Sequence, residues 1–524
     1  MKLKLLFGAF IATLLTACGG GGGGSSSSSD SDSGSGGGGG GGGGDNTSSA
    51  PTFSTGTTAS VLEGTRTVLT VEATAGIDFN AEEGSGPDNS KFTLSTDNEL
   101  IFNTTTGFDF ETPIDSDTDN VYQVSFVATE GSESTTLDLA ITVTDAFEGR
   151  VIDGPVSGAT VFIDVDGDYT QDADELSGTT DINGLFFVEK GDVTISASSK
   201  LISVGGTDTT TNKALPDLAL VSDVPTAASA SAYITPISTI IAAADTPAAK
   251  LEVLTALGIS AADLGADASD AAAVIQAFIA KDVWAESVAG DAAAQAIQTK
   301  NVQIAEVLIS AVNVADTSDA ATAVSRAVAM TKSFAEGLVT QAATGQQIIS
   351  TETAADGTVS FKIVEDAISS ALIVAVQTYT ALATVTDTSL DALVATATAL
   401  EALAVFAADL AAVITSVTDQ LNFADITDVS AVSVITAAKD SAETAVTGIA
   451  TAVVAADATE LAAYASGSLS STIAATVTSA EANVVAAVAA AVVESATASA
   501  QAAADLTNTG YSLPEVISVL ETVE

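Results

Sequence analysis

The chain has 524 residues, of which 67 are acidic and 15 are basic, so its formal net charge is −52 at neutral pH. This charge argues strongly against a nucleic-acid partner, because neutralising phosphates requires lysine and arginine side chains. There is no histidine and only one cysteine, which also excludes histidine-based catalysis, zinc sites built from histidine or several cysteines, and a disulfide within the chain. Two roles for the acidity stay open: solubility in a salty medium, or binding of hard cations such as calcium through oxygen ligands.

The N-terminus has the pattern of a secretory signal that ends at a lipid-attachment site. Lys2 and Lys4 precede an apolar run over residues 5–15, which is too short to span a bilayer. A leucine, two small residues and Cys18 then resemble the lipobox of bacterial lipoproteins. The resemblance implies that residues 1–17 are removed as a signal peptide and that Cys18 is lipidated, so that acyl chains anchor the protein in a membrane.

The residues after Cys18 lead to two further expectations. Gly19 follows the cysteine, and by resemblance to bacterial lipoproteins the lack of aspartate there implies the outer membrane, with surface exposure; the periplasmic face of a membrane is the alternative. Residues 19–44 are almost entirely glycine and serine, a composition that behaves as a flexible coil. We therefore expect residues 18–50 to consist of the lipidated cysteine and a flexible tether.

Residues 51–148 have the pattern of an antiparallel β-sandwich. Short segments alternate between apolar and polar residues, and turn residues separate them about every ten positions. Fully alternating segments of this kind predict strands with one buried face. The expected strands cover residues 68–72, 91–94, 99–102, 121–127 and 137–143.

This part of the chain resembles the cadherin-like domains of bacterial surface proteins, which have an immunoglobulin-type sandwich. The resemblance lies in residues 109–111, 115–122, 127–131 and 141–145. It implies a calcium site at one end of the sandwich, and by position its ligands fall on Glu63, Asp109, Glu111 and Asp145.

Turn formation is the alternative role for these acidic residues, because aspartate and asparagine start turns by accepting hydrogen bonds from nearby backbone. For Asp109 and Glu111 we favour calcium binding. For Asp115, Asp117 and Asp119 both interpretations stay open.

Residues 149–222 are expected to form a second, smaller β-sandwich module. Residues 159–163 and 184–188 have the pattern of strands, and residues 181–184 that of the turn before the second one. Together with residues 154–161, these segments resemble the prealbumin-like or Sdr B-like modules of surface proteins.

An acidic loop between these strands is the strongest metal signal in the chain. Carboxylates occupy positions 1, 3, 5, 9 and 12 of a twelve-residue segment, the spacing that an EF-hand uses for calcium. Position 7 would offer a backbone carbonyl, and Tyr169 stands at position 6, where an EF-hand has glycine. A solvated acidic loop without a metal is the alternative. The candidate ligands are Asp164, Asp166, Asp168, Thr170, Asp172 and Glu175.

Residues 223–524 are rich in alanine and have apolar residues at helical spacing, which predicts an all-α bundle or array. One helix is expected to begin at Pro247 and to end at Gly258, and another to begin near Ser512. Residues 357–363 are expected to be a strand or an extended loop. We expect no segment to be long and apolar enough to span a membrane. Phe278 and Trp284 could form an exposed sugar-binding pair, but we favour the helical core.

The beginning of the helical part resembles a segment that follows such β-modules in large bacterial adhesins, at residues 205–208 and 233–240. The sequence therefore predicts a multidomain protein: two β-domains, the cadherin-like sandwich and the small module, followed by an alanine-rich α-helical domain. Its expected function is that of a calcium-binding, lipid-anchored surface protein in adhesion or cell-surface interaction. The expected partners are the membrane, through the lipid, and a second copy of the protein or a cell-surface protein or glycan.

Two other functions stay open. The first is a structural or matrix protein that self-associates through its helical half. The second is a surface enzyme acting on carbohydrates through paired carboxylates. We favour it least and expect no enzymatic activity, because sugar clefts need aromatic platforms and only 5% of the residues are aromatic, with a single tryptophan.

Overall fold

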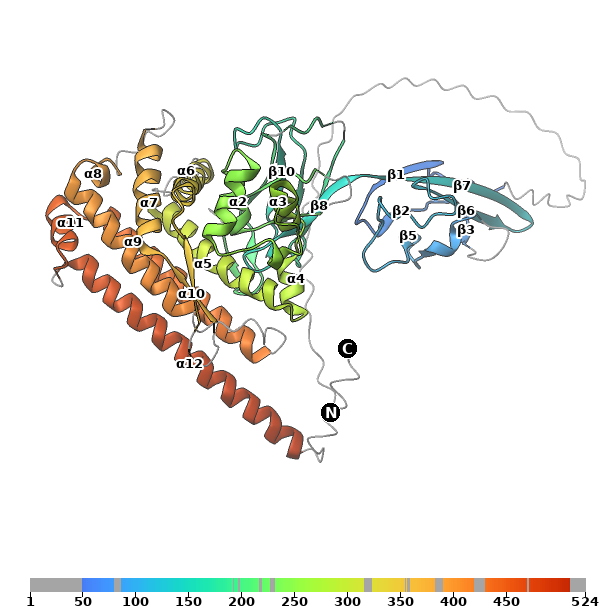
Figure 1. Ribbon diagram of the computed structural model, residues 1–524. Helices are drawn as coiled ribbons and strands as arrows, with labels where there is room; N and C mark the ends of the chain where they lie inside the picture. The colour runs from blue at the N-terminus through green and yellow to red at the C-terminus, as the bar shows by residue number, and fades with distance from the viewer. Residues whose placement is uncertain are drawn as a thin grey trace, which may run out of the picture. The chain divides into compact units, whose positions relative to one another are not determined.

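The computed structural model describes residues 50–79, 86–191, 193–196, 198–215, 219–226, 231–314, 323–353, 355, 359–381, 390–418, 429–468 and 471–508. Cys18, the tether and the helix expected near Ser512 lie outside these residues. The described part is rich in β-sheet at its N-terminal side and helical at its C-terminal side (Figure 1), as the sequence predicted.

Two sheets form the first β-rich region. Strands of the first sheet follow the order β1-β7-β6-β3, with β1 parallel to β7, and strands of the second follow β2-β5-β4. The long hairpin of β6 and β7 alternates buried and exposed side chains, as the sequence predicted. The strands are β1 (Thr58–Leu62), β2 (Thr67–Thr70), β3 (Gly76–Asp78), β4 (Phe92–Leu94), β5 (Glu99–Phe102), β6 (Val121–Glu130) and β7 (Glu133–Thr144), and a short 3-10 turn, η1 (Asn89–Lys91), precedes β4.

An aromatic cluster fills the space inside this region. The rings of Phe102 and Phe108 stack with their centroids 4.0 Å apart, and Tyr122 from β6 meets both rings edge-on. Tyr122 and Phe126 are almost fully buried, as are the large apolar residues of β7, Leu137, Leu139, Ile141 and Val143. This core is separate from the core of the rest of the chain.

Ten short strands form three further sheets, which together make up the second group of sheets. Their orders are β11-β10-β13-β16, β12-β8-β17 and β15-β14-β9. The strand β16 spans residue 222, and β17 lies beyond it, so these sheets extend past the position at which we expected helices to begin. The strands are β8 (Ala146–Val151), β9 (Val156–Ser157), β10 (Thr160–Asp164), β11 (Ser177–Thr179), β12 (Leu185–Glu189), β13 (Lys200–Val204), β14 (Thr207–Asp208), β15 (Lys213–Ala214), β16 (Ala219–Asp223) and β17 (Ala232–Ile234).

Helices make up most of the remaining described residues. The expected limits of the helix at Pro247 are confirmed: Thr246 caps it by accepting a hydrogen bond from the Ala249 amide, and Gly258 follows it with a φ of 65°. The helices are α1 (Pro236–Ala242), α2 (Pro247–Ala256), η2 (Ala262–Leu264), α3 (Ala271–Ile279), α4 (Val283–Val288), α5 (Ala292–Val314), α6 (Ala323–Ala343), α7 (Glu365–Thr380), α8 (Asp391–Val394), α9 (Ala397–Thr418), α10 (Val429–Val454), α11 (Ala458–Ala465) and α12 (Thr472–Asn508).

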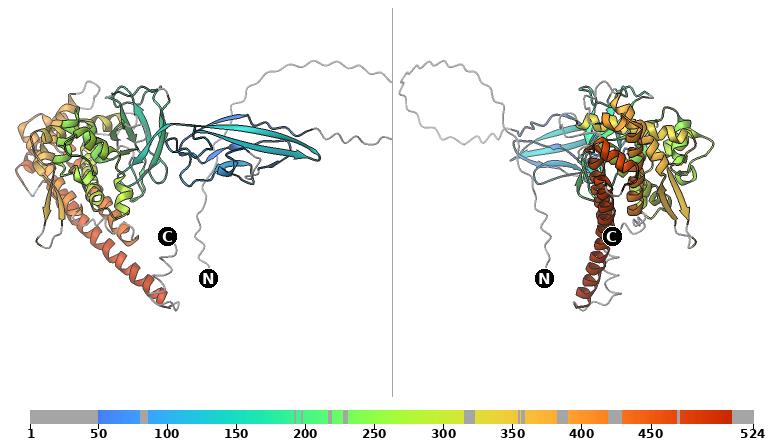
Figure 2. Two further views of the ribbon diagram at one scale, coloured as in Figure 1. Left: turned by 45° about the vertical axis from the view of Figure 1, so that its right-hand side comes forward. Right: turned by 90° about the vertical axis from the view of Figure 1, so that its left-hand side faces the viewer.

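A β-hairpin interrupts the helices, and its second strand lies where a strand or an extended loop was expected, at residues 357–363, of which 357 and 358 lie outside the described residues. It consists of β18 (Ile349–Thr353) and β19 (Val359–Ile363), which pair in antiparallel register and project from the helices in Figure 2. The core interpretation of Phe278 and Trp284 is also confirmed. Phe278 is buried in α3, and Trp284 packs half-buried against the same core.

One continuous hydrophobic core joins the second group of sheets to the helices. It extends from Phe147 in β8 through α5 to Val488 in α12. The helix α5 contacts α1, α4, α6, α9 and α10, so its side chains are buried on most sides. Buried apolar area is the main source of folding free energy, and we therefore expect these sheets and helices to unfold together.

Two helices are long and apolar enough to span a membrane, judged by length and composition only. The expectation that no segment would meet these criteria is therefore wrong. Residues 397–415 of α9 and residues 472–491 of α12 are apolar enough, although half of the first stretch is buried among other helices. Only 28% of the second stretch is buried. α12 packs mainly along α10 and also contacts α9 and α11, and its buried apolar residues include Ile473, Val477, Val484 and Val488.

Candidate metal centres

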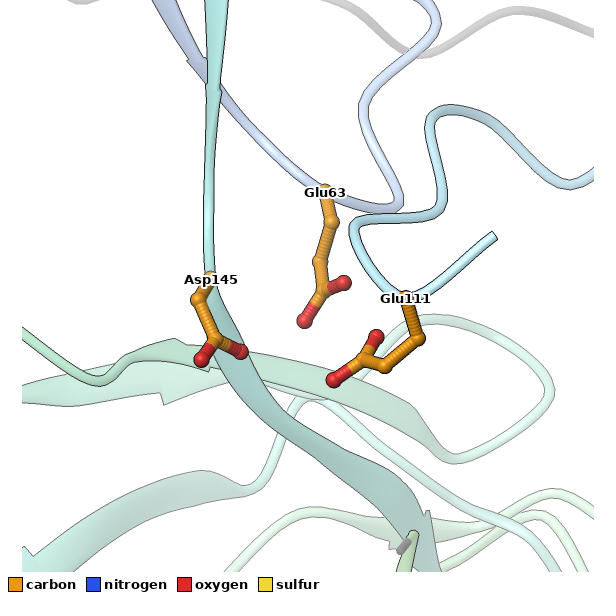
Figure 3. A group of neighbouring side chains, drawn as sticks. All are labelled: Glu63, Glu111 and Asp145. Atoms are coloured by element: carbon orange, nitrogen blue, oxygen red, sulfur yellow. The ribbon is translucent and has the colours of Figure 1, made fainter. Parts of the chain in front are cut away.

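Glu63, Glu111 and Asp145 come together at one end of the first β-rich region. Glu63 follows β1, Asp145 lies between β7 and β8, and Glu111 lies in the loop before β6. One carboxylate oxygen of each lies within 4.8 Å of the others. Figure 3 shows the three side chains reaching this place from three different segments. The spacing is compatible with shared coordination of one cation.

Backbone groups hold Glu63 in position. Its Oε1 accepts a hydrogen bond from the Ala146 amide at 2.7 Å, and its Oε2 accepts one from the Phe110 amide at 3.1 Å. The side chain is 2% exposed. Burial raises the pKa of Glu63 to about 7, and the charges of Glu111 and Glu148 contribute to the increase. A divalent cation would favour the charged form of this carboxyl group.

A lysine ammonium already neutralises part of this group. Lys190 follows β12, and its Nζ lies 2.6 Å from Oδ1 of Asp145 and 3.9 Å from Oε1 of Glu111. The same ammonium lies 5.2 Å from the centre of the Phe147 ring. A metal ion at Glu63, Glu111 and Asp145 would therefore compete with Lys190 for the carboxylate of Asp145.

A cleft of about 600 Å³ borders this group. Asp145 and Lys190 line it together with Phe110, Thr144, Phe147 and Ile195. The group is thus accessible from solvent on the side of Asp145 and Lys190, while Glu63 is buried behind them.

Asp109 lies outside this group. Its side chain is exposed, and its Oδ1 accepts a hydrogen bond from the Thr112 amide at 2.8 Å, so it bonds to nearby backbone as the turn interpretation expects. Sequence reasoning did not assign Glu148, whose charge acts on both Glu63 and Glu111. The sequence signal for Glu148 is its position, three residues after the predicted ligand Asp145 and within β8.

The acidic loop after β10 brings Asp164, Asp166 and Asp168 together. One carboxylate oxygen of each lies within 4.8 Å of the others. Asp164 is the last residue of β10 and is fully buried. Its Oδ1 accepts the Gly167 amide at 2.7 Å and its Oδ2 accepts the Tyr169 amide at 2.9 Å, so the loop wraps around this carboxylate. Burial raises the pKa of Asp164 despite these hydrogen bonds.

The backbone turns sharply at the sixth position of this loop. Tyr169 has a φ of 68°, in the left-handed region that side-chain-bearing residues rarely adopt. An EF-hand loop makes its sharp turn at the same position, normally with glycine. The Tyr169 ring packs against a small apolar cluster that includes Phe162 and Ile202, and the Nζ of Lys332 lies 5.4 Å from its centre.

The remaining predicted ligands of the loop lie outside the group of three aspartates. Glu175 turns back toward the loop, and its two oxygens accept hydrogen bonds from the Val165 amide at 2.7 Å and the Asp172 amide at 3.0 Å. Asp172 and Thr170 are exposed. Glu175 thus closes the loop through backbone contacts, with both carboxylate oxygens directed at its own loop.

Both of these acidic groups could therefore hold a hard cation through carboxylate oxygens. Comparison with known proteins gives no further information on their ligands, because no protein-family model matches the chain and no curated protein is similar to it.

Proposed function

We propose that this protein is a calcium-binding, lipid-anchored cell-surface protein that mediates adhesion or another cell-surface interaction. The observation that carries the proposal is the loop after β10. Its aspartates at positions 1, 3 and 5 have oxygens within 4.8 Å of one another, and its position 6 is left-handed. Together these are the spacing and the backbone turn of an EF-hand calcium loop.

The sequence resemblances support the cellular part of the proposal. A lipobox at Cys18, a glycine-rich tether and a cadherin-like β-region are the parts of an anchored protein that projects from a cell. The outer membrane is the proposed location, and calcium is the proposed cofactor. The partner is a second copy of the protein or a cell-surface protein or glycan.

Calcium would act by offsetting repulsion between carboxylates. Three negative groups within 4.8 Å of one another repel each other when no cation lies among them. Extracellular calcium modules bind with dissociation constants of about 10⁻⁴–10⁻³ M. At about ten times that constant, one site stabilises the folded chain by about 1.4 kcal/mol.

Thermal unfolding of the purified full-length protein tests calcium binding. We expect calcium to raise Tm by a few degrees relative to the chelator EDTA. Asp166→Asn should remove most of the increase that the loop contributes, because Asp166 is exposed and its only described hydrogen bond is with the Asp168 amide. Asp174→Asn is the matched control, since Asp174 is an exposed aspartate of the same loop outside the group. If calcium raises the Tm of the two variants equally, the assignment of a calcium site to this loop is wrong.

Attachment of cells tests the biological role. Cells that display the full-length chain should attach to one another or to a glycan-coated surface in calcium and detach in EDTA. Cells with Asp166→Asn should attach less than cells with Asp174→Asn at equal surface display. Cys18→Ala should remove the protein from the membrane fraction and abolish palmitate labelling. Attachment that is independent of both calcium and the protein would refute the adhesive role.

A matrix protein is the second candidate, and one feature of α12 favours it. Between residues 472 and 491 only one face of this helix is buried, and Val485 on another face is 54% exposed. Several exposed alanines lie in the same stretch, and small and apolar side chains of this kind can pack against another copy. Sedimentation of the wild type and of Val485→Glu distinguishes the two functions, because self-association through α12 would be lost in the variant.

A further inference from the structure

A third group of carboxylates lies in the loop that leads into β6. Asp115, Asp117 and Asp119 each place one oxygen within 4.8 Å of the others. The loop lies at the same end of the sheet as Asp145, because Val121 at the start of β6 pairs with Thr142 near the end of β7. It shares no residue with either group described above.

The buried carboxylate of Asp115 points to a ligand. Asp115 is 4% exposed. Its Oδ2 accepts a hydrogen bond from the Asp119 amide at 2.9 Å, but its Oδ1 is buried and has no donor within the described part of the chain. A buried acceptor without a partner destabilises the folded state, and more so when it is charged. This cost is removed when a cation binds the oxygen.

Among the described residues, no lysine or arginine forms an ion pair with Asp115, Asp117 or Asp119. This differs from the group at Glu63, where Lys190 supplies a counterion.

The fold holds the beginning of this loop firmly. Asp88 is fully buried, and its oxygens accept hydrogen bonds from the Ser116 amide at 2.7 Å and the Gln123 amide at 2.8 Å. At the other end of the loop, Asn120 donates from Nδ2 to the Phe110 carbonyl at 2.9 Å. The aspartates of the loop are therefore brought together before any ion binds.

We propose that Asp115, Asp117 and Asp119 form a third calcium site, in which the buried Oδ1 of Asp115 is the anchoring ligand. Three aspartates contribute oxygen ligands of the kind that calcium prefers. The proposal rests on the proposed function for the identity of the cation, but it involves different residues and can fail separately.

Calorimetric titration of the full-length protein with calcium chloride tests this site. The starting variant carries Asp166→Asn and Glu63→Gln, which weaken the other two groups. Asp117→Asn is then added, because Asp117 is exposed and its side chain is not needed to hold the loop. We expect this substitution to weaken the remaining calcium binding by at least tenfold. Asp97→Asn, an exposed aspartate in the turn between β4 and β5, is the matched control and should change nothing.

The outcomes separate this proposal from the proposed function. Equal binding with Asp117→Asn and Asp97→Asn would overturn the third site. The absence of calcium binding in the starting variant would also overturn the third site. This holds even when the wild type binds calcium and Asp166→Asn weakens that binding. If the wild type itself binds no calcium, both proposals fail.

Discussion

At the scale of single residues, the nearest counterion distinguishes the acidic groups. Lys190 lies against Asp145 and Glu111, whereas no ion pair among the described residues reaches Asp115, Asp117 or Asp119. An ammonium and a calcium ion compete for the charge of the same carboxylate. Lys190 therefore weakens the binding of a metal at Glu63, Glu111 and Asp145.

Replacing Lys190 is expected to strengthen calcium binding at Glu63, Glu111 and Asp145. Lys190→Gln removes the competing charge, and we expect affinity to rise about tenfold, or about 1.4 kcal/mol, the low end for unit charges about 4 Å apart. Calorimetry with calcium chloride measures the change. Lys362→Gln is the control, because Lys362 forms a similar ion pair with Glu352 at 2.6 Å on the β18–β19 hairpin. Unchanged or weaker calcium binding in Lys190→Gln would show that this group is a permanent ion pair.

At the scale of elements, one buried lysine joins three segments of the helical part. The Nζ of Lys300 in α5 donates a hydrogen bond to the Gly258 carbonyl at 2.6 Å, just after α2 ends. It also lies 4.7 Å from the centre of the Phe361 ring in β19. Burial lowers the pKa of Lys300 to about 8, and the charge of Asp263 only partly opposes this.

Lys300 should make the free energy of unfolding depend on pH in the alkaline range. An unfolded lysine has a pKa of about 10.4, so between about pH 8 and pH 10.4 the unfolded chain binds a proton that the folded chain has lost. The contribution of Lys300 to the free energy of unfolding therefore rises with pH in this window, by up to about 3 kcal/mol. Urea unfolding of the wild type and of Lys300→Met at several pH values measures it. If the difference in free energy of unfolding between the wild type and Lys300→Met is the same at pH 8 and pH 10, the prediction is wrong.

At the scale of the whole described molecule, a buried ionic cluster connects the second group of sheets to the helices. Lys439 of α10 is 5% exposed, and its Nζ lies 2.7 Å from Oδ2 of Asp208 and 3.2 Å from Oδ1 of Asp153. Burial alone would lower the pKa of Lys439, but Asp153 and Asp208 raise it above its usual value. Glu306 of α5 is buried nearby, and burial raises its pKa.

Removing the lysine of this cluster should destabilise sheets and helices together. Lys439→Met leaves Asp153 and Asp208 buried without their counterion, at a cost of about 3–5 kcal/mol. Urea unfolding followed by circular dichroism should show one transition at lower urea. Lys332→Met is the control, because Lys332 pairs with Glu336 at the surface, where the effect of an ion pair is below about 1 kcal/mol. Where Lys439→Met does not fold, adding Asp208→Asn should restore folding. Equal stability of Lys439→Met and Lys332→Met would refute the role of the cluster.

The sequence alone determined the features that depend on neighbouring residues. Alternation predicted β6 and β7, the Thr246-Pro247 pair and Gly258 predicted the limits of α2, and the spacing of Asp164, Asp166 and Asp168 predicted their meeting in one loop. These features arise from backbone geometry and from hydrogen bonds that span only a few residues, so they are visible in the local pattern.

Only the tertiary structure decided which distant residues meet. It brought Glu111 rather than Asp109 to Glu63, placed Lys190 beside Asp145, and left one oxygen of Asp115 buried without a donor. It also joined the second group of sheets to the helices in one core. Such contacts depend on how strands and loops that are far apart in the chain pack together, and the local pattern of a single sequence contains no information on this packing.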